Sequence, residues 1–186
     1  MFYINAIHDG GAERVMINLT KYFSEIGYDT ILVTSFRDKW EYTVPERVKR
    51  FSLENTEIKQ SKWKRNLSRI CKLRELCKKE KPDLLVSFMA EPNFRALIAT
   101  IGLPIKNLVS VRNDPEIEYG GMIGHLVGKL LLPLADGCVF QTDEAKKWFP
   151  QKLQRKSQII YNSVKEDFYH VQRKPHKREI VTCGRL

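Results

Sequence analysis

Short runs of β-branched, aliphatic and aromatic residues alternate along this chain with longer segments of helical periodicity. Seven of these runs predict strands, at 2–7, 30–35, 47–53, 84–88, 107–111, 137–141 and 158–161. The amphipathic segments between them predict helices, at about 12–26, 63–80, 92–101, 119–132 and 143–149. This alternation predicts an α/β fold, with a Rossmann-like, open and mostly parallel sheet and helices on both faces.

The loops that follow the predicted strands are where functional residues are expected. In open parallel sheets, ligands bind beyond the carboxyl ends of the strands. Four loops of this sequence follow predicted strands in that way, at 8–11, 89–93, 112–115 and 162–164.

Composition restricts the partner and the compartment. The 186 residues carry a net charge of +10, which favours an anionic partner: nucleic acid, a phosphorylated substrate or an anionic membrane surface. The four cysteines have neither zinc-site nor disulfide-framework spacing, which indicates a reducing cytoplasm. The most apolar stretch, 122–135, is too short to span a bilayer. No pattern of metal ligands or of a serine or cysteine nucleophile is found, so neither a metal nor a cofactor is expected.

Two adjacent glycines, Gly10 and Gly11, lie between the first predicted strand and the first predicted helix. Glycines let the backbone approach a ligand closely, and a helix N-terminus offers free N–H groups and partial positive charge to a phosphate. The alternative is a tight turn with no ligand. The spacing matches neither the three-glycine dinucleotide fingerprint nor the glycine-lysine phosphate loop.

Polar residues follow two further predicted strands. The carboxylate of Glu91 can orient a substrate hydroxyl, although an acid before Pro92 also suits a simple helix start. Arg112 can bind a phosphate or a hydroxyl through its planar fork of donors, but it is a poor general base because it stays protonated. Asn113 and Asp114 follow it, and they also fit a turn in which the side chain satisfies its own backbone.

Six segments together resemble retaining glycosyltransferases of family four, which have the two-domain GT-B architecture. The first is Gly10-Gly11-Ala12-Glu13-Arg14-Val15 followed by Asn18-Leu19, which is similar to the first loop and helix of that family. The others, in the family's order, lie at 82–88, 110–115, 135–142, 159–164 and 181–186. Glu91, Pro92 and Asn93 resemble the family's acceptor-side loop, while Arg112 stands where some relatives carry a histidine near the reacting sugar.

The resemblance implies that this chain is the N-terminal half of a GT-B enzyme. It implies an acceptor-side domain at 1–171, a basic linker at 172–179 and the start of a donor-binding domain at 180–186. In such enzymes a nucleotide-sugar, here expected to be linked to UDP, gives a hexose or N-acetylhexosamine to a lipid-linked glycan. Gly10 and Gly11 would approach the donor diphosphate, and the acceptor would meet Glu91, Asn93, Arg112, Asn113 and Asp114. The chain alone is expected to be inactive, because most of the donor site would belong to the C-terminal domain.

The segment 59–81 carries ten basic residues against Glu75 and Glu80. Its apolar residues recur at helical spacing on one stripe, at Trp63, Leu67, Ile70, Leu73 and Leu76 or Cys77. An amphipathic helix with one cationic face is therefore predicted, with its apolar stripe packing on the sheet. That face is either simply solvated or rests on anionic lipid at the inner face of the cell membrane. The candidates for lipid contact are Lys62, Lys64, Arg65, Lys72, Lys78 and Lys79. Nucleic acid is disfavoured because no aromatic stacking platform accompanies the charge.

A second class of function stays open on this sequence. A free-standing, non-catalytic α/β module would use the same basic face to bind a nucleotide, nucleic acid or protein partner.

Overall fold

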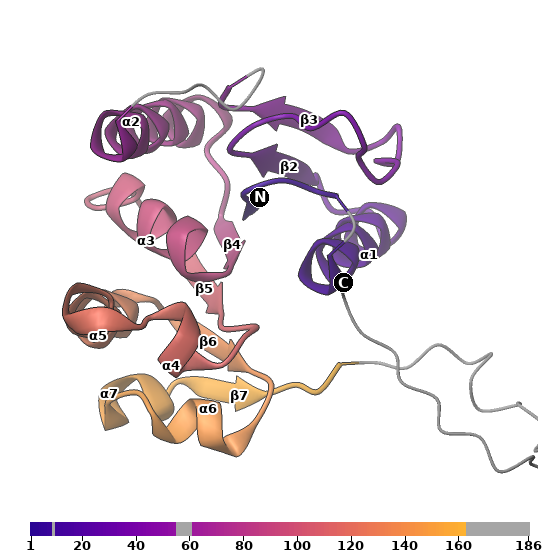
Figure 1. Cartoon of the computed structure of the whole chain (residues 1–186). Coiled ribbons are helices and arrows are strands. Elements are labelled where there is room, and N and C mark those ends of the chain that lie inside the picture. Colours follow the sequence, from indigo (N-terminus) through magenta and orange to yellow (C-terminus); the bar gives the residue numbers. More distant parts are fainter. Residues whose placement is uncertain (9, 55–60, 163–186) are drawn as a thin grey trace, which may run out of the picture.

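A computed structural model describes residues 1–8, 10–54 and 61–162 (Figure 1). They form one seven-stranded sheet in the order β3-β2-β1-β4-β5-β6-β7, and every neighbouring pair is parallel. The strands are β1 (Phe2–Ile4), β2 (Ile31–Thr34), β3 (Lys49–Ser52), β4 (Leu84–Phe88), β5 (Lys106–Ser110), β6 (Gly137–Phe140) and β7 (Ser157–Ile159). The helices are α1 (Gly11–Glu25), α2 (Lys62–Glu80), α3 (Ala90–Ala99), α4 (Pro115–Glu118), α5 (Gly121–Leu131), α6 (Asp143–Lys147) and α7 (Gln151–Gln154), with a 3-10 turn at Leu132–Leu134.

The strand order places a topological switch point at the centre of the sheet. The chain moves outward from β1 through β2 to β3, and then returns to the other side of β1 to build β4 to β7. β1 and β4 are paired in register at Phe2 with Val86 and at Tyr3 with Ser87. In open α/β sheets, ligands bind beyond the carboxyl ends of the strands on either side of such a point, and we call this region, beyond β1 and β4, the crevice.

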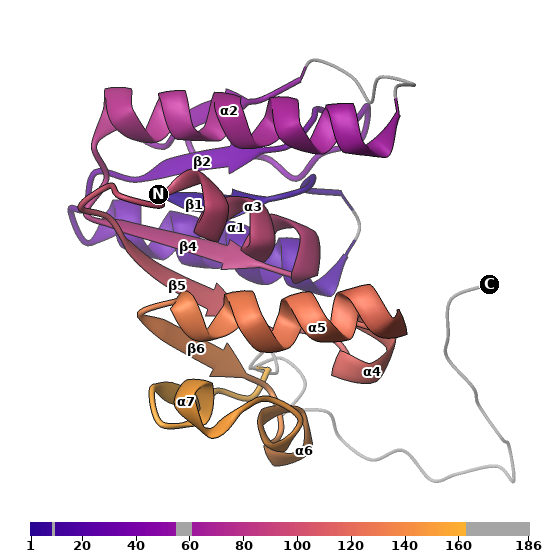
Figure 2. The ribbon, with the colours of Figure 1, turned by 90° about the vertical axis from the view of Figure 1, so that its left-hand side faces the viewer.

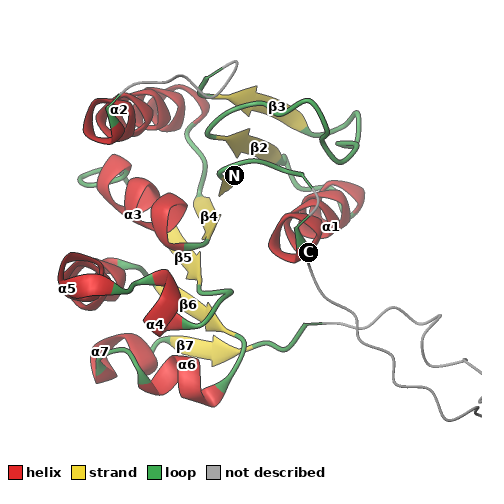
Figure 3. Cartoon of the chain, viewed as in Figure 1, coloured by secondary structure: helices red, strands yellow, loops and turns green. Residues whose placement is uncertain are grey.

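The two faces of the sheet are covered unequally by the described residues. α2, α3 and α5 form a layer on one face, whereas α1 lies on the other (Figures 1 and 2). Colouring by secondary structure shows the same separation of α1 from the other helices (Figure 3). Beside α1 the sheet leaves a largely apolar groove of about 810 Å³, whose lining includes Phe2, Val86 and Leu108.

The predicted fold class is confirmed, and all seven predicted strands are present, β4 with the predicted bounds and the others with ends shifted by at most three residues. The helix predicted at 119–132 is present as α5, shorter by two residues at its start and by one at its end, whereas α4 and α7 were not predicted. Asp114 caps α4 by accepting the Glu116 N–H at 2.9 Å. The chain then turns at Gly121, whose φ of +77° suits glycine and separates α4 from α5. Tyr119, between the two helices, has its ring buried against Phe94, Trp148 and Phe149.

The apolar stripe predicted for α2 packs on the sheet only in the later part of the helix. Leu73 and Cys77 are buried as predicted, but Trp63 and Leu67, near the start of the helix, are 82% and 64% exposed. Arg69, one of the basic residues of this segment, is also buried, and its guanidinium lies 2.7 Å from Glu54. A buried charge requires a partner, and Glu54 beside β3 provides one, so the helix can turn a basic residue inward.

The described cysteines, Cys71, Cys77 and Cys138, are free thiols. None of the helices within the described ranges has the length and apolar character needed to cross a membrane. The predicted linker at 172–179 and the predicted start of a second domain at 180–186 lie outside the described residues.

Candidate functional site

The glycine pair lies at the N-terminus of α1, directly beyond β1. Gly10 is the N-cap, with an extended backbone (φ −95°), and Gly11 is the first helical residue. A Cβ added to Gly11 would meet no atom within 4 Å, whereas one added to Gly10 would collide with the folded-back carboxylate of Glu13. The first N–H groups of a helix have no partner within the helix, so this end can receive an anion. Gly11 borders open space at that end, and Glu13 lies over Gly10.

The turn from β4 into α3 is held in an uncommon conformation. Met89 has a φ of +75°, which side-chain-bearing residues seldom adopt and which often marks a functional loop. The Met89 N–H donates to the Ser110 carbonyl at 3.2 Å, so the turn is anchored to the neighbouring strand β5. Glu91 follows in the first turn of α3, and its carboxylate reaches Asn5, which directly follows β1.

Glu91 is an exposed glutamate, and one oxygen of its carboxylate is held by neighbouring side chains. Its side chain is 64% exposed, and its Oε2 lies 2.5 Å from the Arg95 guanidinium and 3.5 Å from the Asn5 amide nitrogen. Burial of the carboxyl would raise the pKa of Glu91, but the charge and hydrogen bonds of Arg95 and the hydrogen bond of Asn5 together lower it. Glu91 is therefore kept ionised, and suits accepting hydrogen bonds from hydroxyl groups better than removing protons.

Asn93 lies inside the fold, unlike Glu91 two residues before it. Its side chain is fully buried. Its Oδ1 accepts from the Ser87 hydroxyl at 2.8 Å, and its amide nitrogen donates to the Ser110 carbonyl at 3.1 Å and to Tyr119 Oη at 3.5 Å. The side-chain amide of Asn93 is thus hydrogen-bonded to other residues of the protein, and Asn93 positions the start of α3 against β4 and β5.

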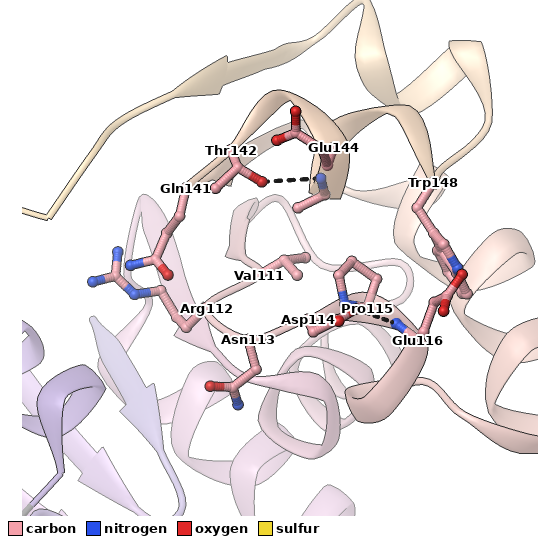
Figure 4. Close-up of a pocket in the computed structure, with 11 residues that line it drawn as sticks. Val111, Arg112, Asn113, Asp114, Pro115, Glu116, Gln141, Thr142, Glu144 and Trp148 are labelled. Carbon is pink, nitrogen blue, oxygen red and sulfur yellow. Dashed lines mark hydrogen bonds between the residues drawn. The ribbon is translucent and has the colours of Figure 1, made fainter. Parts of the chain in front are cut away.

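A pocket of about 450 Å³, lined by both polar and apolar side chains, opens between the loops that follow β5 and β6 (Figure 4). Thr142 caps α6 by accepting the Ala145 N–H at 3.1 Å, and Asp114 caps α4, the local role that the turn interpretation predicts. Trp148 closes one side, and the carboxylates of Glu116 and Glu144 are available at the rim (Figure 4). Carboxylates, amides and an aromatic ring together can bind a small polar ligand that also has an apolar face, such as a sugar ring.

Arg112 borders both this pocket and the apolar groove. Its guanidinium carbon lies 4.9 Å from the centre of the Phe88 ring, and its Nη2 donates to Asn162 Oδ1 at 2.6 Å. Burial lowers the pKa of Arg112, yet arginine stays protonated in proteins. Its Nε is buried and makes no hydrogen bond within the described residues. Arg112 is thus a fixed positive charge at the carboxyl end of β5. Asn113, beside it, is exposed.

Glu118 links the loops that follow β4 and β5, and it was not predicted from the sequence. Its Oε1 accepts the Ala90 N–H at 2.6 Å, at the start of α3, and a second backbone hydrogen bond comes from Asn113. Burial raises the pKa of Glu118, although both hydrogen bonds act in the opposite direction. Only tertiary packing brings Glu118 to the start of α3, so no local pattern could have revealed it.

The residues proposed for membrane contact belong to α2, which lies in one layer with α3 and α5 (Figure 2). Lys64 is exposed near the start of α2, where Trp63 and Leu67 are exposed too, and Lys78 and Lys79 are exposed at its end. Lys72 donates to the Leu53 carbonyl at 3.0 Å and so is partly committed to the fold. Arg65 is half-buried, and the Lys62 side chain lies outside the described part. α5, in the same layer, exposes three further apolar side chains: Met122, Leu126 and Leu130.

The comparisons with known proteins agree with this architecture. Residues 9–168 match the model of Glycosyltransferase Family 4, whereas no curated protein matches the whole-chain sequence. Similar solved structures include the lipopolysaccharide outer core galactosyltransferase WaaB in its apo form, at 14% identity and a TM-score of 0.68 over 88% of this chain and 46% of that one. Another is Alr3699/HepE of Anabaena, in complex with UDP and glucose, at 16% identity and a TM-score of 0.64 over 90% of this chain and 45% of that one. A third is UDP-GlcNAc 2-epimerase from Methanocaldococcus jannaschii, at 11% identity and a TM-score of 0.62 over 86% of this chain and 45% of that one. At these identities the structures show the shared fold alone, and this chain spans less than half the length of each.

Proposed function

Because this chain belongs to glycosyltransferase family 4, we propose that it forms the acceptor-side half of a retaining enzyme. The enzyme transfers a hexose or N-acetylhexosamine from a nucleotide-sugar, linked to UDP, to a lipid-linked glycan. The observation that carries this proposal is Glu91: an exposed carboxylate, held ionised, at the topological switch point where α/β folds bind ligands. The rival proposal of a non-catalytic basic module has only the net charge in its favour.

Each part of the site has a task in this proposal. Glu91 accepts a hydrogen bond from an acceptor hydroxyl and so orients it for reaction. The pocket between the β5 and β6 loops holds a sugar ring of the acceptor against Trp148, and Arg112 supplies positive charge beside it. The open N-terminus of α1 at Gly11 faces the donor diphosphate.

The donor site is completed by a second domain in this proposal. Stabilising the charge that grows on the leaving diphosphate requires a closed, water-poor cleft, which one domain does not supply. The chain of residues 1–186 by itself is therefore expected to transfer no sugar. UDP is the expected nucleotide because HepE, which shares the fold, was solved with UDP and glucose.

The layer of α2, α3 and α5 is the surface that we assign to the membrane. Lipid-linked acceptors lie at the bilayer, and each lysine or arginine near an anionic surface contributes about 1 kcal/mol of attraction. The exposed Trp63 and Leu67 add apolar area beside the cationic residues, a combination typical of helices that lie in the membrane interface. The protein would thus work at the cytoplasmic face of the cell membrane.

The test is a transfer assay on the natural protein that contains this chain, with UDP-sugars and a lipid-linked acceptor. Glu91→Gln should lower kcat/KM for the acceptor about tenfold, equivalent to about 1.4 kcal/mol. Glu25→Gln, which neutralises an exposed carboxylate paired with Lys21 at the C-terminal end of α1, serves as the matched control and should leave kcat/KM unchanged. Wild-type kcat/KM in a folded Glu91→Gln enzyme would refute the acceptor role, and absence of transfer from any nucleotide-sugar would refute the proposed reaction.

A further inference from the structure

Arg95 lies one helical turn after Glu91 on α3 and is almost completely buried, with 3% of its surface exposed. Its guanidinium makes five hydrogen bonds to side chains of four residues. Nε and Nη2 donate to Asn66 Oδ1 at 3.1 and 2.8 Å, and Nη1 donates to Asn5 Oδ1 at 2.6 Å and Ser35 Oγ at 3.2 Å. Nη2 also lies 2.5 Å from Glu91 Oε2.

These partners come from four separate parts of the fold that meet at the switch point. Asn5 directly follows β1, Ser35 directly follows β2, Asn66 belongs to α2 and Glu91 begins α3. The Ser35 hydroxyl in turn bonds Asn5 Oδ1 at 3.0 Å and Tyr3 Oη at 2.9 Å. One guanidinium therefore ties two strand ends and two helices to the Glu91 carboxylate.

A buried arginine is a costly way to pack two helices together. Removing a guanidinium from water is unfavourable, and apolar residues of similar volume often stabilise a fold as well or better. What an arginine provides in addition is a rigid planar fork that holds its partners at set directions. Only one of the partners, Glu91, projects into solvent, and an exposed glutamate would otherwise sample several rotamers. The fork of Arg95 therefore restricts the orientation of the Glu91 side chain.

We propose that Arg95 is a positioning residue for the transfer reaction, fixing the Glu91 carboxylate in the direction from which it receives the acceptor hydroxyl. This inference rests on the proposed acceptor role of Glu91. Asn66 acts with Arg95, because its Oδ1 fixes the edge of the guanidinium opposite to Asn5 and couples the orientation of Glu91 to α2.

The experiment compares three variants of the natural protein: Arg95→Lys, Asn66→Ala and, as control, Arg74→Lys. Lysine at position 95 keeps the charge but loses the fork, and Asn66→Ala removes two of the five hydrogen bonds without changing any charge. Arg74 joins the same two helices, since its Nη1 donates to the Ala99 and Ile101 carbonyls at 2.8 and 2.7 Å at the far end of α3. A loss of helix packing alone would therefore affect Arg74→Lys as well.

Arg95→Lys should raise the KM for the acceptor about tenfold, since a misplaced group of this kind readily costs one order of magnitude. The KM for the nucleotide-sugar should stay within about twofold of wild type, because Arg95 lies on the acceptor side. Asn66→Ala should change the acceptor KM in the same direction, and Glu91→Gln added to Arg95→Lys should cause no further loss. Carbon-13 NMR of the Glu91 carboxyl should show its pKa raised in Arg95→Lys and unchanged in Arg74→Lys.

Two results separate the possible failures. If folded Arg95→Lys keeps a wild-type acceptor KM while Glu91→Gln lowers kcat/KM for the acceptor, the positioning role of Arg95 is wrong and the proposed function stands. If Glu91→Gln itself leaves kcat/KM for the acceptor unchanged, the acceptor role of Glu91 and this inference are wrong together. Should Arg95→Lys fail to fold, Asn66→Ala decides, because a wild-type acceptor KM in that variant would overturn the proposal.

Discussion

Replacing Gly11 by valine tests whether the N-terminus of α1 receives the donor diphosphate. Gly11 has no positive φ and a Cβ there would meet no atom within 4 Å, so the fold has room for a side chain. Alanine should leave stability unchanged or raise it by up to about 1 kcal/mol, because glycine is a poor helix residue. Valine should cost at most a few tenths of a kcal/mol through its restricted χ1.

Activity should respond in the opposite way from stability. A side chain at Gly11 fills the space through which the diphosphate would approach the helix N–H groups, so Gly11→Val should lower turnover at least tenfold, about 1.4 kcal/mol of transition-state stabilisation. Gly11→Ala should have a smaller effect in the same direction. The assay is sugar transfer by the natural protein, with a thermal melting curve for each variant.

Gly102→Ala is the matched control for this pair. Gly102 has a φ of +72°, and it lies in the turn between α3 and β5, at the end of the sheet away from the crevice. Alanine there should lower stability by about 1 kcal/mol because of backbone strain, with turnover unchanged. A soluble Gly11→Val enzyme that melts normally and turns over at the wild-type rate would show that the glycine pair is only a turn.

Two further predictions concern α2 and Glu118. Changing Lys64, Lys78 and Lys79 to glutamate should weaken binding to anionic vesicles without altering the melting temperature, and salt should weaken the binding of the wild type. The control is the same change at three lysines outside α2, Lys21, Lys39 and Lys106. Equal binding of the wild type to neutral vesicles would contradict the electrostatic basis of the attraction. Because burial raises the pKa of Glu118 above its ordinary 4.5, its protonation stabilises the fold below that pH, and this stabilisation is lost as pH rises through the folded pKa. Glu118→Gln should therefore gain stability relative to wild type in urea unfolding between about pH 4 and pH 7, and a difference that does not change with pH would contradict the assignment.

The order and type of the elements were determined by the sequence alone, because periodicity is a local property. Continuous apolar runs such as Ile31–Thr34 can only be buried on both faces, and the segments between them have helical spacing. The same reasoning located the functional loops, since parallel strands bring their carboxyl ends to one edge of the sheet. The four-residue helices α4 and α7 escaped it, because helical periodicity shows only over a longer window.

Only the tertiary structure decided which polar residues are exposed and which are used inside the fold. Glu91 and Asn93 are two residues apart in the same predicted loop, yet one is exposed and the other is buried among Ser87, Ser110 and Tyr119. The roles of Arg95 and Glu118 depend on partners from distant segments, and the inward turn of Arg69 depends on Glu54. A buried charge or amide is stable only where another element supplies its partner, and that pairing is set by packing rather than by local sequence.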